Sequence, residues 1–251
     1  MAGPKAGRGV AVVSGASSGI GAATAASLVA EGFEVVLGAR RVDRLADVAG
    51  PLGAAARSLP LDVTDARSVA DFAAQVPECR VLVNNAGGAL GTDPVADFDE
   101  DRWRTMYETN VIGTTRMVRA FLPALVASGD GHVVTIGSIA GFEPYPGGAG
   151  YNAAKHAERA VTDVLRMELL GQPVRVTEID PGMVETEFSL VRFGGDEERA
   201  AKVYQGVTPL TAGDIADCVA FAVTRPSHVD VDQMVVRPRD QARAHLLHRR
   251  T

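Results

Sequence analysis

Cysteine is scarce in this sequence. Only Cys79 and Cys218 occur among the 251 residues, and neither belongs to a CxxC pair or has a histidine-rich neighbourhood. A disulfide framework needs several cysteines, and a structural zinc site needs closely spaced cysteine and histidine ligands. The sequence therefore predicts no disulfide and no metal site, and each cysteine is expected to be a small buried apolar residue.

Long apolar runs and an excess of basic residues are also missing. No stretch reaches the roughly 18 uninterrupted apolar residues of a membrane helix, and the segment 1–8 lacks the apolar centre of a signal peptide. The formal net charge is −6, which argues against the basic face of a nucleic-acid-binding protein. We expect a cytoplasmic protein that binds neither nucleic acid nor membrane, with a flexible N-terminus over residues 1–8.

Short apolar runs alternate with amphipathic stretches along the whole chain. Hydrophobic residues make up 46% of the sequence and no low-complexity tract interrupts them, so one domain over residues 1–251 can bury a core. The order of strand and helix patterns predicts an α/β fold, a doubly wound parallel sheet covered by helices on both faces. Ligands bind such sheets beyond the carboxyl ends of the strands. The main predicted segments are strands at 10–13, 35–37, 81–83, 133–136 and 174–179, and helices at 22–30 and 41–49.

A glycine-rich turn follows the first predicted strand. It reads Ser14-Gly-Ala-Ser-Ser-Gly-Ile-Gly21 and leads directly into a helical pattern. Glycine lets the backbone turn tightly and approach a pyrophosphate, which the free N–H groups of a helix start can bind. The turn lacks the Lys-Ser/Thr ending of an NTPase loop, so it indicates a dinucleotide. The expected cofactor contacts here are Gly15, Ser17, Ser18, Gly19 and Ile20.

Two arginines follow the second predicted strand. Arg40 and Arg41 stand where NAD-binding proteins usually place an acidic residue for the ribose 2′-hydroxyl. Guanidinium groups can instead hold a 2′-phosphate through bidentate hydrogen bonds. This favours NADP(H) over NAD as the cofactor.

Two more strand ends offer polar groups to a nucleotide. Asp62 and Val63 follow the third predicted strand, where the carboxylate can accept a hydrogen bond from an adenine amino group. Asn85, Ala86 and Gly87 follow the fourth strand, and their small size suits close approach of a ribose. A helix-start aspartate and an ordinary polar turn are the alternative interpretations.

Tyr151 and Lys155 are spaced i, i+4 on a predicted helix, so the ammonium can lie beside the phenol. A nearby cation favours phenolate, which predicts Tyr151 as general base for alcohol oxidation and general acid for carbonyl reduction. Ser138, just past the fifth strand, is expected to donate a hydrogen bond to the developing oxyanion. Such a tyrosine–lysine pair alone is usually surface packing. Its coincidence with the glycine turn and the other strand-end motifs indicates a catalytic centre.

The ordered motifs SGASSGIG, DV, NNAG, Asn110, Ser138, YNAAK and Pro181-Gly182 resemble those of the short-chain dehydrogenase/reductase family over nearly the whole chain. The resemblance implies a Rossmann-type, three-layer, seven-stranded parallel sheet in the order 3-2-1-4-5-6-7, and a homodimer or homotetramer. It implies a catalytic tetrad in which Asn110 holds a water that links Lys155 to solvent. The further cofactor contacts expected are Tyr151, Lys155, Pro181, Gly182, Val184 and Thr186.

A narrower resemblance is to the NADP-dependent 3-hydroxy acid dehydrogenases that act on serine and allo-threonine. The loop after Pro181-Gly182 is one residue shorter than in that subgroup, and Ser14 stands where threonine is usual. In the family this loop closes over nicotinamide and substrate. Arg192 either pairs with a substrate carboxylate or is a solvated arginine on the lid. The expected substrate residues are Ser138, Glu143, Tyr145, Met183, Phe188 and Arg192.

The sequence therefore predicts an NADP-dependent oxidoreductase that transfers a hydride between NADP(H) and a small hydroxy acid or other alcohol or carbonyl compound. One alternative is an NADPH-dependent reductase of an aldehyde or ketone in a biosynthetic pathway. Another is a catalytically silent NADP-binding sensor. The locally basic C-terminal tail, residues 237–251, is expected to fray, with packing on a neighbouring subunit as the alternative.

Overall fold

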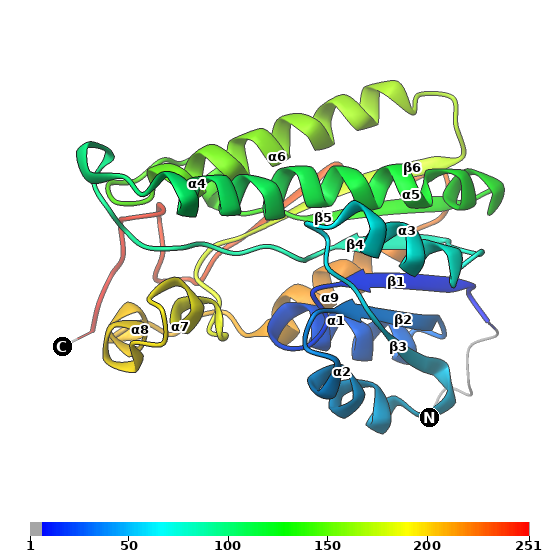
Figure 1. The fold of residues 1–251 in the computed structure, drawn as a ribbon, viewed down its shortest axis with the longest axis horizontal. Coiled ribbons are helices and arrows are strands. Elements are labelled where there is room, and N and C mark those ends of the chain that lie inside the picture. The colour runs from blue at the N-terminus through cyan, green and yellow to red at the C-terminus, as the bar shows by residue number, and fades with distance from the viewer. Residues whose placement is uncertain (1–6, 251) are drawn as a thin grey trace.

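The structure is a computed structural model that describes residues 7–250 (Figure 1). Most of the segment predicted to be a flexible N-terminus, residues 1–6, lies outside the described residues. Arg8 is already held in place, because its backbone N–H donates a hydrogen bond of 2.9 Å to the carbonyl of Gly32.

Within residues 7–250, seven parallel strands form one sheet in the predicted order β3-β2-β1-β4-β5-β6-β7. The apolar runs become strands because both faces of a parallel sheet are buried under helices. The strands are β1 (Val10–Ser14), β2 (Glu34–Ala39), β3 (Ala56–Pro60), β4 (Val81–Asn84), β5 (Gly131–Ile136), β6 (Val174–Pro181) and β7 (Gln233–Val236).

Helices cover both faces of the sheet, so the fold is the three-layer, doubly wound α/β domain that the sequence predicts (Figure 1). Short turns join these elements, among them η2 (Val95–Asp97), η4 (Ile139–Gly141) and the π-helical turn η3 (Glu108–Gly113). The helices are α1 (Gly19–Ala30), α2 (Val42–Ala49), α3 (Ala66–Ala74), α4 (Glu100–Tyr107), α5 (Thr114–Ala127), α6 (Ala149–Glu168), α7 (Phe188–Arg192), α8 (Glu197–Tyr204) and α9 (Ala212–Val223); η1 (Gly50–Ala55) follows α2.

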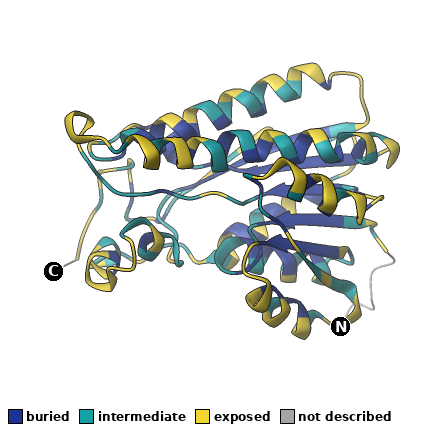
Figure 2. Ribbon diagram, in the orientation of Figure 1, coloured by how far each residue is buried: buried dark blue, intermediate teal, exposed yellow. Residues whose placement is uncertain are grey.

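The alternation of side chains along each strand divides the core in two. Ala11 and Val13 of β1 face the cluster that α1, α2 and α9 complete, whereas Val12 faces the cluster under α3 and α5. Burial is concentrated along the sheet and on the inner sides of the helices (Figure 2). The two cores therefore fix the strand ends, and α7 and α8 stand apart beyond the carboxyl ends of the strands (Figure 1).

The C-terminal tail does not fray over residues 237–250. Arg237 and Arg243 each donate a hydrogen bond of 2.8 Å to one carboxylate oxygen of Glu143, and the backbone N–H of Ala244 donates to the other at 2.9 Å. The buried Gln241 side chain accepts a hydrogen bond of 2.8 Å from the N–H of Met183. The predicted fraying is thus wrong, because the nearly buried Glu143 carboxylate has to be paired and the tail supplies its partners.

Among the described residues, the helices are all too short or too polar to span a membrane.

Candidate active site

A cavity of about 660 Å³ lies between the carboxyl ends of the strands and the segment that carries α7. All the residues predicted to contact the cofactor line this cavity, and so do the predicted substrate residues other than Glu143. The structure does not bring Glu143 to the cavity wall, since its carboxylate holds the C-terminal tail. Tail residues Gln241 and Ala244 line the cavity instead.

The glycine-rich turn is packed tightly against the end of β4. The hydroxyl of Ser14 accepts hydrogen bonds of 3.1 Å from the N–H groups of both Asn85 and Ala86. Gly15 has a φ of +65°, and a Cβ atom at that position would lie 2.8 Å from the Cα of Ala86. A Cβ at Gly21 would lie 2.5 Å from the amide nitrogen of Asn85. These two glycines are required because two loops approach closely, whatever ligand lies above them.

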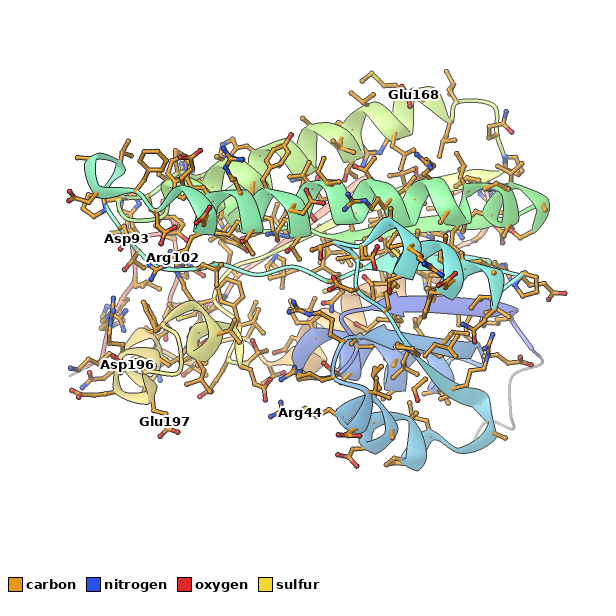
Figure 3. The ribbon with its side chains drawn as sticks, viewed as in Figure 1. Arg44, Asp93, Arg102, Glu168, Asp196 and Glu197 are labelled. Atoms are coloured by element: carbon orange, nitrogen blue, oxygen red, sulfur yellow. The ribbon has the colours of Figure 1, made fainter. Side chains whose placement is uncertain are left out.

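A cluster of hydrogen-bond donors lies at the end of β2. The Arg41 side chain donates to the hydroxyls of Ser17 and Ser18 at 3.1 and 2.7 Å and to the Glu187 carboxylate at 2.8 Å. Arg44, which the sequence reasoning missed, donates to the other Glu187 oxygen at 2.5 Å. It projects from α2 toward the side of the molecule where α7 and α8 lie (Figure 3). The arginine contacts lower the pKa of Glu187 to about 2. The cluster already holds one anion, so its donor set fits a phosphate.

Arg40 and Asp62 lie beside this cluster. Arg40 is exposed and lines the cavity, as do Asp62 and Val63. One Asp62 carboxylate oxygen accepts hydrogen bonds from both the N–H and the hydroxyl of Thr64, at 3.0 and 2.7 Å. Asp62 therefore shapes the turn after β3 as well as facing the cavity.

Ser138 and Tyr151 meet at the centre of the cavity. The Ser138 hydroxyl accepts a hydrogen bond of 3.1 Å from the N–H of Ala140, which fixes the serine at the start of η4. Tyr151 lies in the first turn of α6, and the side chain of Ser138 acts to lower the pKa of its phenol. Its ring lies edge-on to that of Phe188 on α7, with 5.5 Å between the centroids.

The environment of Tyr151 departs from the sequence-based expectation. Burial raises the pKa of the Tyr151 phenol above its usual value, whereas the charge of Lys155 and the side chain of Ser138 act to lower it. The expected effect of the cation is present, but the removal of water from the buried ring outweighs it. The phenol of Tyr151 is therefore expected to carry its proton at neutral pH.

Asn110 lies beneath the cavity in the π-helical turn η3. Its side chain donates hydrogen bonds to the carbonyls of Gly88 and Met106, at 3.0 and 2.7 Å, and accepts one of 3.2 Å from the N–H of Gly88. It is fully buried, and a Cβ at Gly87 would lie 2.5 Å from its carboxamide oxygen. Asn110 thus fixes the loop after β4. The water that it is expected to hold between Lys155 and solvent stays a prediction.

Lys155 has a partner that the sequence reasoning missed. Its ammonium donates to the carbonyl of Ile136 at 2.9 Å and to the carboxylate of Glu158 at 2.5 Å. Glu158 also accepts a hydrogen bond of 3.2 Å from the hydroxyl of Thr114 on α5. The i, i+3 spacing of Lys155 and Glu158 on one helix was the available signal.

Arg192 reaches the cavity from the end of α7. Its guanidinium donates to the carbonyl of Gly91 at 3.1 Å and to the hydroxyl of Tyr145 at 2.9 Å. The remaining nitrogen, Nη2, is buried and has no hydrogen-bond partner within residues 7–250. The guanidinium carbon lies 6.0 Å from the centre of the Tyr151 ring. Arg192, which lines the cavity, therefore keeps one buried, unpaired donor nitrogen on a guanidinium near the tyrosine ring.

The profile of a family described as short chain dehydrogenase matches residues 9–193. The chain belongs to the short-chain dehydrogenase family. An uncharacterized oxidoreductase of Mycobacterium tuberculosis is 59% identical over 94% of this chain and 93% of that protein. An NADP-dependent 3-hydroxy acid dehydrogenase of Schizosaccharomyces pombe is 41% identical over 95% of this chain and 96% of that protein. The solved closed form of a serine dehydrogenase complexed with NADP⁺ superposes with a TM-score of 0.91 at 38% identity, covering 96% of this chain and all of that chain.

These findings confirm the family, the fold and the cofactor that the sequence predicted. The dehydrogenase is an oxidoreductase that acts on CH–OH groups with NADP(H). The anion-binding arginine cluster agrees with a 2′-phosphorylated cofactor.

Two carboxylates of this dehydrogenase are buried side by side on β6. Burial and the neighbouring charge of Asp180 raise the pKa of Glu178 from 4.5 to about 8. Between pH 4.5 and about 8, Glu178 keeps its proton in the folded protein but has released it in the unfolded chain. The free energy of unfolding should therefore fall as pH rises from about 5 to about 8. Replacing Glu178 by glutamine should remove most of this pH dependence, which amounts to an unfolding free energy on the order of a few kcal/mol over that pH range. Urea unfolding at both ends of that pH range measures it.

The matched control for this prediction is Glu34→Gln, an exposed glutamate at the start of β2. It should keep the wild-type slope. An unchanged slope in Glu178→Gln would show that Glu178 is ionised in the folded protein at neutral pH.

Proposed function

We propose that this dehydrogenase interconverts a small 3-hydroxy acid and the corresponding 3-oxo acid. The observation that carries the proposal is the unpaired Nη2 of Arg192 beside Tyr151. A buried guanidinium nitrogen without a partner loses hydrogen-bonding free energy, which a substrate carboxylate would restore. The names of the similar proteins support a substrate of this kind, since both serine and 3-hydroxy acids carry a carboxylate.

The geometry suits a substrate with its hydroxyl two carbons away from the carboxyl group. Arg192, Tyr145 and Tyr151 line one cavity together with Ser138. The guanidinium carbon of Arg192 lies 5.6 Å from the centre of the Tyr145 ring and 6.0 Å from that of Tyr151. A short 3-hydroxy acid can place its carboxylate at Arg192 while its hydroxyl approaches Tyr151. Met183 and Phe188 would close the apolar side, and Glu143 would act only through the tail that it anchors.

The chemistry assigns one role to each residue of the centre. Bound NADP(H) accepts or supplies the hydride. Tyr151 takes the hydroxyl proton during oxidation and returns it during reduction, while Ser138 donates a hydrogen bond to the substrate oxygen. Lys155 supplies a positive charge that stabilises the phenolate, and Asn110 holds the loop beside it.

The cofactor would lie across the carboxyl ends of β1, β2 and β4. We assign the 2′-phosphate to Arg41, with Arg40 and Arg44 beside it, and the pyrophosphate to the start of α1. The remaining contacts are Gly15, Ser17, Ser18, Gly19, Ile20, Asp62, Val63, Asn85, Ala86, Gly87, Tyr151, Lys155, Pro181, Gly182, Val184 and Thr186.

Arg192→Met tests the substrate assignment. Hydrogen bonds to a charged group contribute about 1.5–3 kcal/mol, so KM for a 3-hydroxy acid should rise by roughly 10- to 100-fold while turnover of a neutral alcohol of equal length stays unchanged. Initial rates of NADPH formation with serine, 3-hydroxybutyrate and the matched neutral alcohols measure the difference. Arg199→Met, at an exposed arginine of α8, is the control. It should change neither KM for the 3-hydroxy acid nor turnover of the neutral alcohol. A wild-type enzyme that prefers the neutral alcohols would refute the assignment.

A homodimer or homotetramer and a cytoplasmic location remain predictions. The outer side of α6 exposes Val164 and Met167, and Leu170 is exposed just past the end of the helix. This apolar surface supports burial against another copy. Light scattering in solution measures the number of subunits.

A further inference from the structure

A buried ion pair lies behind the catalytic face of α6. Lys155 and Glu158 expose only 6% and 2% of their side chains, and 2.5 Å separates the ammonium nitrogen from a carboxylate oxygen. The second carboxylate oxygen is held by Thr114, so the glutamate is fixed from two helices. A charged group buried this deeply is retained only with a well-placed partner.

We propose that Glu158 is a positioning residue of this dehydrogenase, which fixes the ammonium of Lys155 as a charged group directed toward Tyr151. The inference rests on the proposed function, because it assumes that Lys155 assists Tyr151. Two of the three Lys155 donors are bound to Ile136 and Glu158. The third is left for the cavity, which Lys155 and Tyr151 both line.

The surroundings of the pair single out Glu158 as the counter-ion. The other charged groups that act on the pair are Tyr151 from helix α6 and Glu178 and Asp180 from β6. Asp180 has its own partners, with Arg159 at 3.9 Å and the side chain of Gln233 at 2.6 Å. Glu178 carries a raised pKa of about 8 and is therefore mostly uncharged at neutral pH. Glu158 is the carboxylate in direct contact with the ammonium.

Removal of the Glu158 charge should change the protonation of Lys155. Burial acts to lower the pKa of Lys155, and the charge of Glu158, followed by that of Tyr151, raises it instead. Without the carboxylate the effect of burial should prevail, so the pKa of Lys155 should be lower in the variant than in the wild-type enzyme. Tyr151 then loses the nearby cation that favours its phenolate. This loss outweighs the direct effect of the Glu158 charge, which raises the pKa of Tyr151 less than Lys155 lowers it.

The test is the pH dependence of alcohol oxidation by Glu158→Gln, which keeps the size and the Thr114 contact. Wild-type kcat should rise with pH and level off. The variant should show a kcat about tenfold lower near pH 8, because a rise of about one in the pKa of Tyr151 lowers the phenolate fraction about tenfold. Its kcat should decline again at higher pH. KM should stay within about twofold of the wild-type value. Glu158→Asp, which retains the charge, should restore most of the wild-type profile.

Glu168→Gln is the matched control, at an exposed glutamate near the far end of the same helix (Figure 3). Its profile should superimpose on that of wild type. A folded Glu158→Gln enzyme with a wild-type pH profile would overturn the proposal.

Urea unfolding of Lys155→Met, Glu158→Gln and the double variant provides a readout that does not depend on turnover. Each single variant leaves one unpaired group buried, so the double variant should be more stable than the sum of the single losses predicts. If Glu158→Gln does not fold, recovery of folding in the double variant supports the pair, and failure to recover overturns it. A wild-type enzyme that oxidises no 3-hydroxy acid would refute the proposed function, whereas this unfolding cycle would still report on the pair.

Discussion

Tyr151→Phe is expected to lower kcat by about 10²–10⁴-fold, the usual contribution of a positioned general acid or base. The substitution removes one oxygen from a buried ring that packs against Phe188. The shape of the cavity should therefore persist while the proton-transfer group is lost. NADPH fluorescence in the presence of the variant should give a Kd within a few-fold of wild type, and absorbance at the NADPH band should show the loss of turnover.

The control is Tyr107→Phe, because Tyr107 is an exposed tyrosine at the end of α4. It should leave kcat unchanged. Retention of full turnover in Tyr151→Phe would mean that another group exchanges the proton. A wild-type protein that binds NADPH but converts no alcohol or carbonyl would favour the sensor interpretation instead.

The pH dependence of the wild-type enzyme should follow from the same residue. Because burial raises the pKa of Tyr151, oxidation, which needs the phenolate, should become faster toward alkaline pH. Reduction needs the protonated phenol and should be supported at neutral pH.

The fold was predictable from the sequence because its signals are local. The apolar run Val10–Val13 becomes β1, which extends by one residue to Ser14, and all of this strand except Val10 is buried. The site was predictable for a related reason. In a parallel sheet each motif that follows a strand comes to the same edge, so Ser138 and Tyr151 meet although they belong to different elements.

Apart from the Lys155–Glu158 pair, which has a local i, i+3 spacing, the contacts that sequence reasoning missed join distant segments. The Glu143 carboxylate meets tail residues about a hundred positions away, and Arg44 meets Glu187 across 143 positions. No local pattern distinguishes such charges from solvated surface residues. The predicted effect of Lys155 on Tyr151 is present, but the larger opposing effect of burial was not foreseen, because burial is a property of the assembled core.

Removal of Arg41 and Arg44 together is expected to weaken NADPH binding by roughly 100-fold or more, as the loss of charge-assisted hydrogen bonds predicts. NADH lacks the 2′-phosphate, so its Kd should stay within a few-fold of wild type. Equilibrium titrations with NADPH, NADH and 2′-AMP distinguish a lost phosphate contact from a damaged loop. Arg67→Ala, at an arginine whose side chain is 89% exposed on α3, is the control and should bind both cofactors normally.

Glu187 provides a second test of the same site, because its substitution should strengthen phosphate binding rather than weaken it. Its carboxylate occupies Arg41 and Arg44 in the structure, so a 2′-phosphate must compete with it for the same donors. Glu187→Gln should therefore bind 2′-AMP more tightly than wild type, while Glu185→Gln, at an exposed residue of the same segment, should not. If both arginine and glutamate variants altered NADH and NADPH binding equally, the cluster would serve to hold the lid against α2, and the 2′-phosphate would have to be bound elsewhere in the cavity.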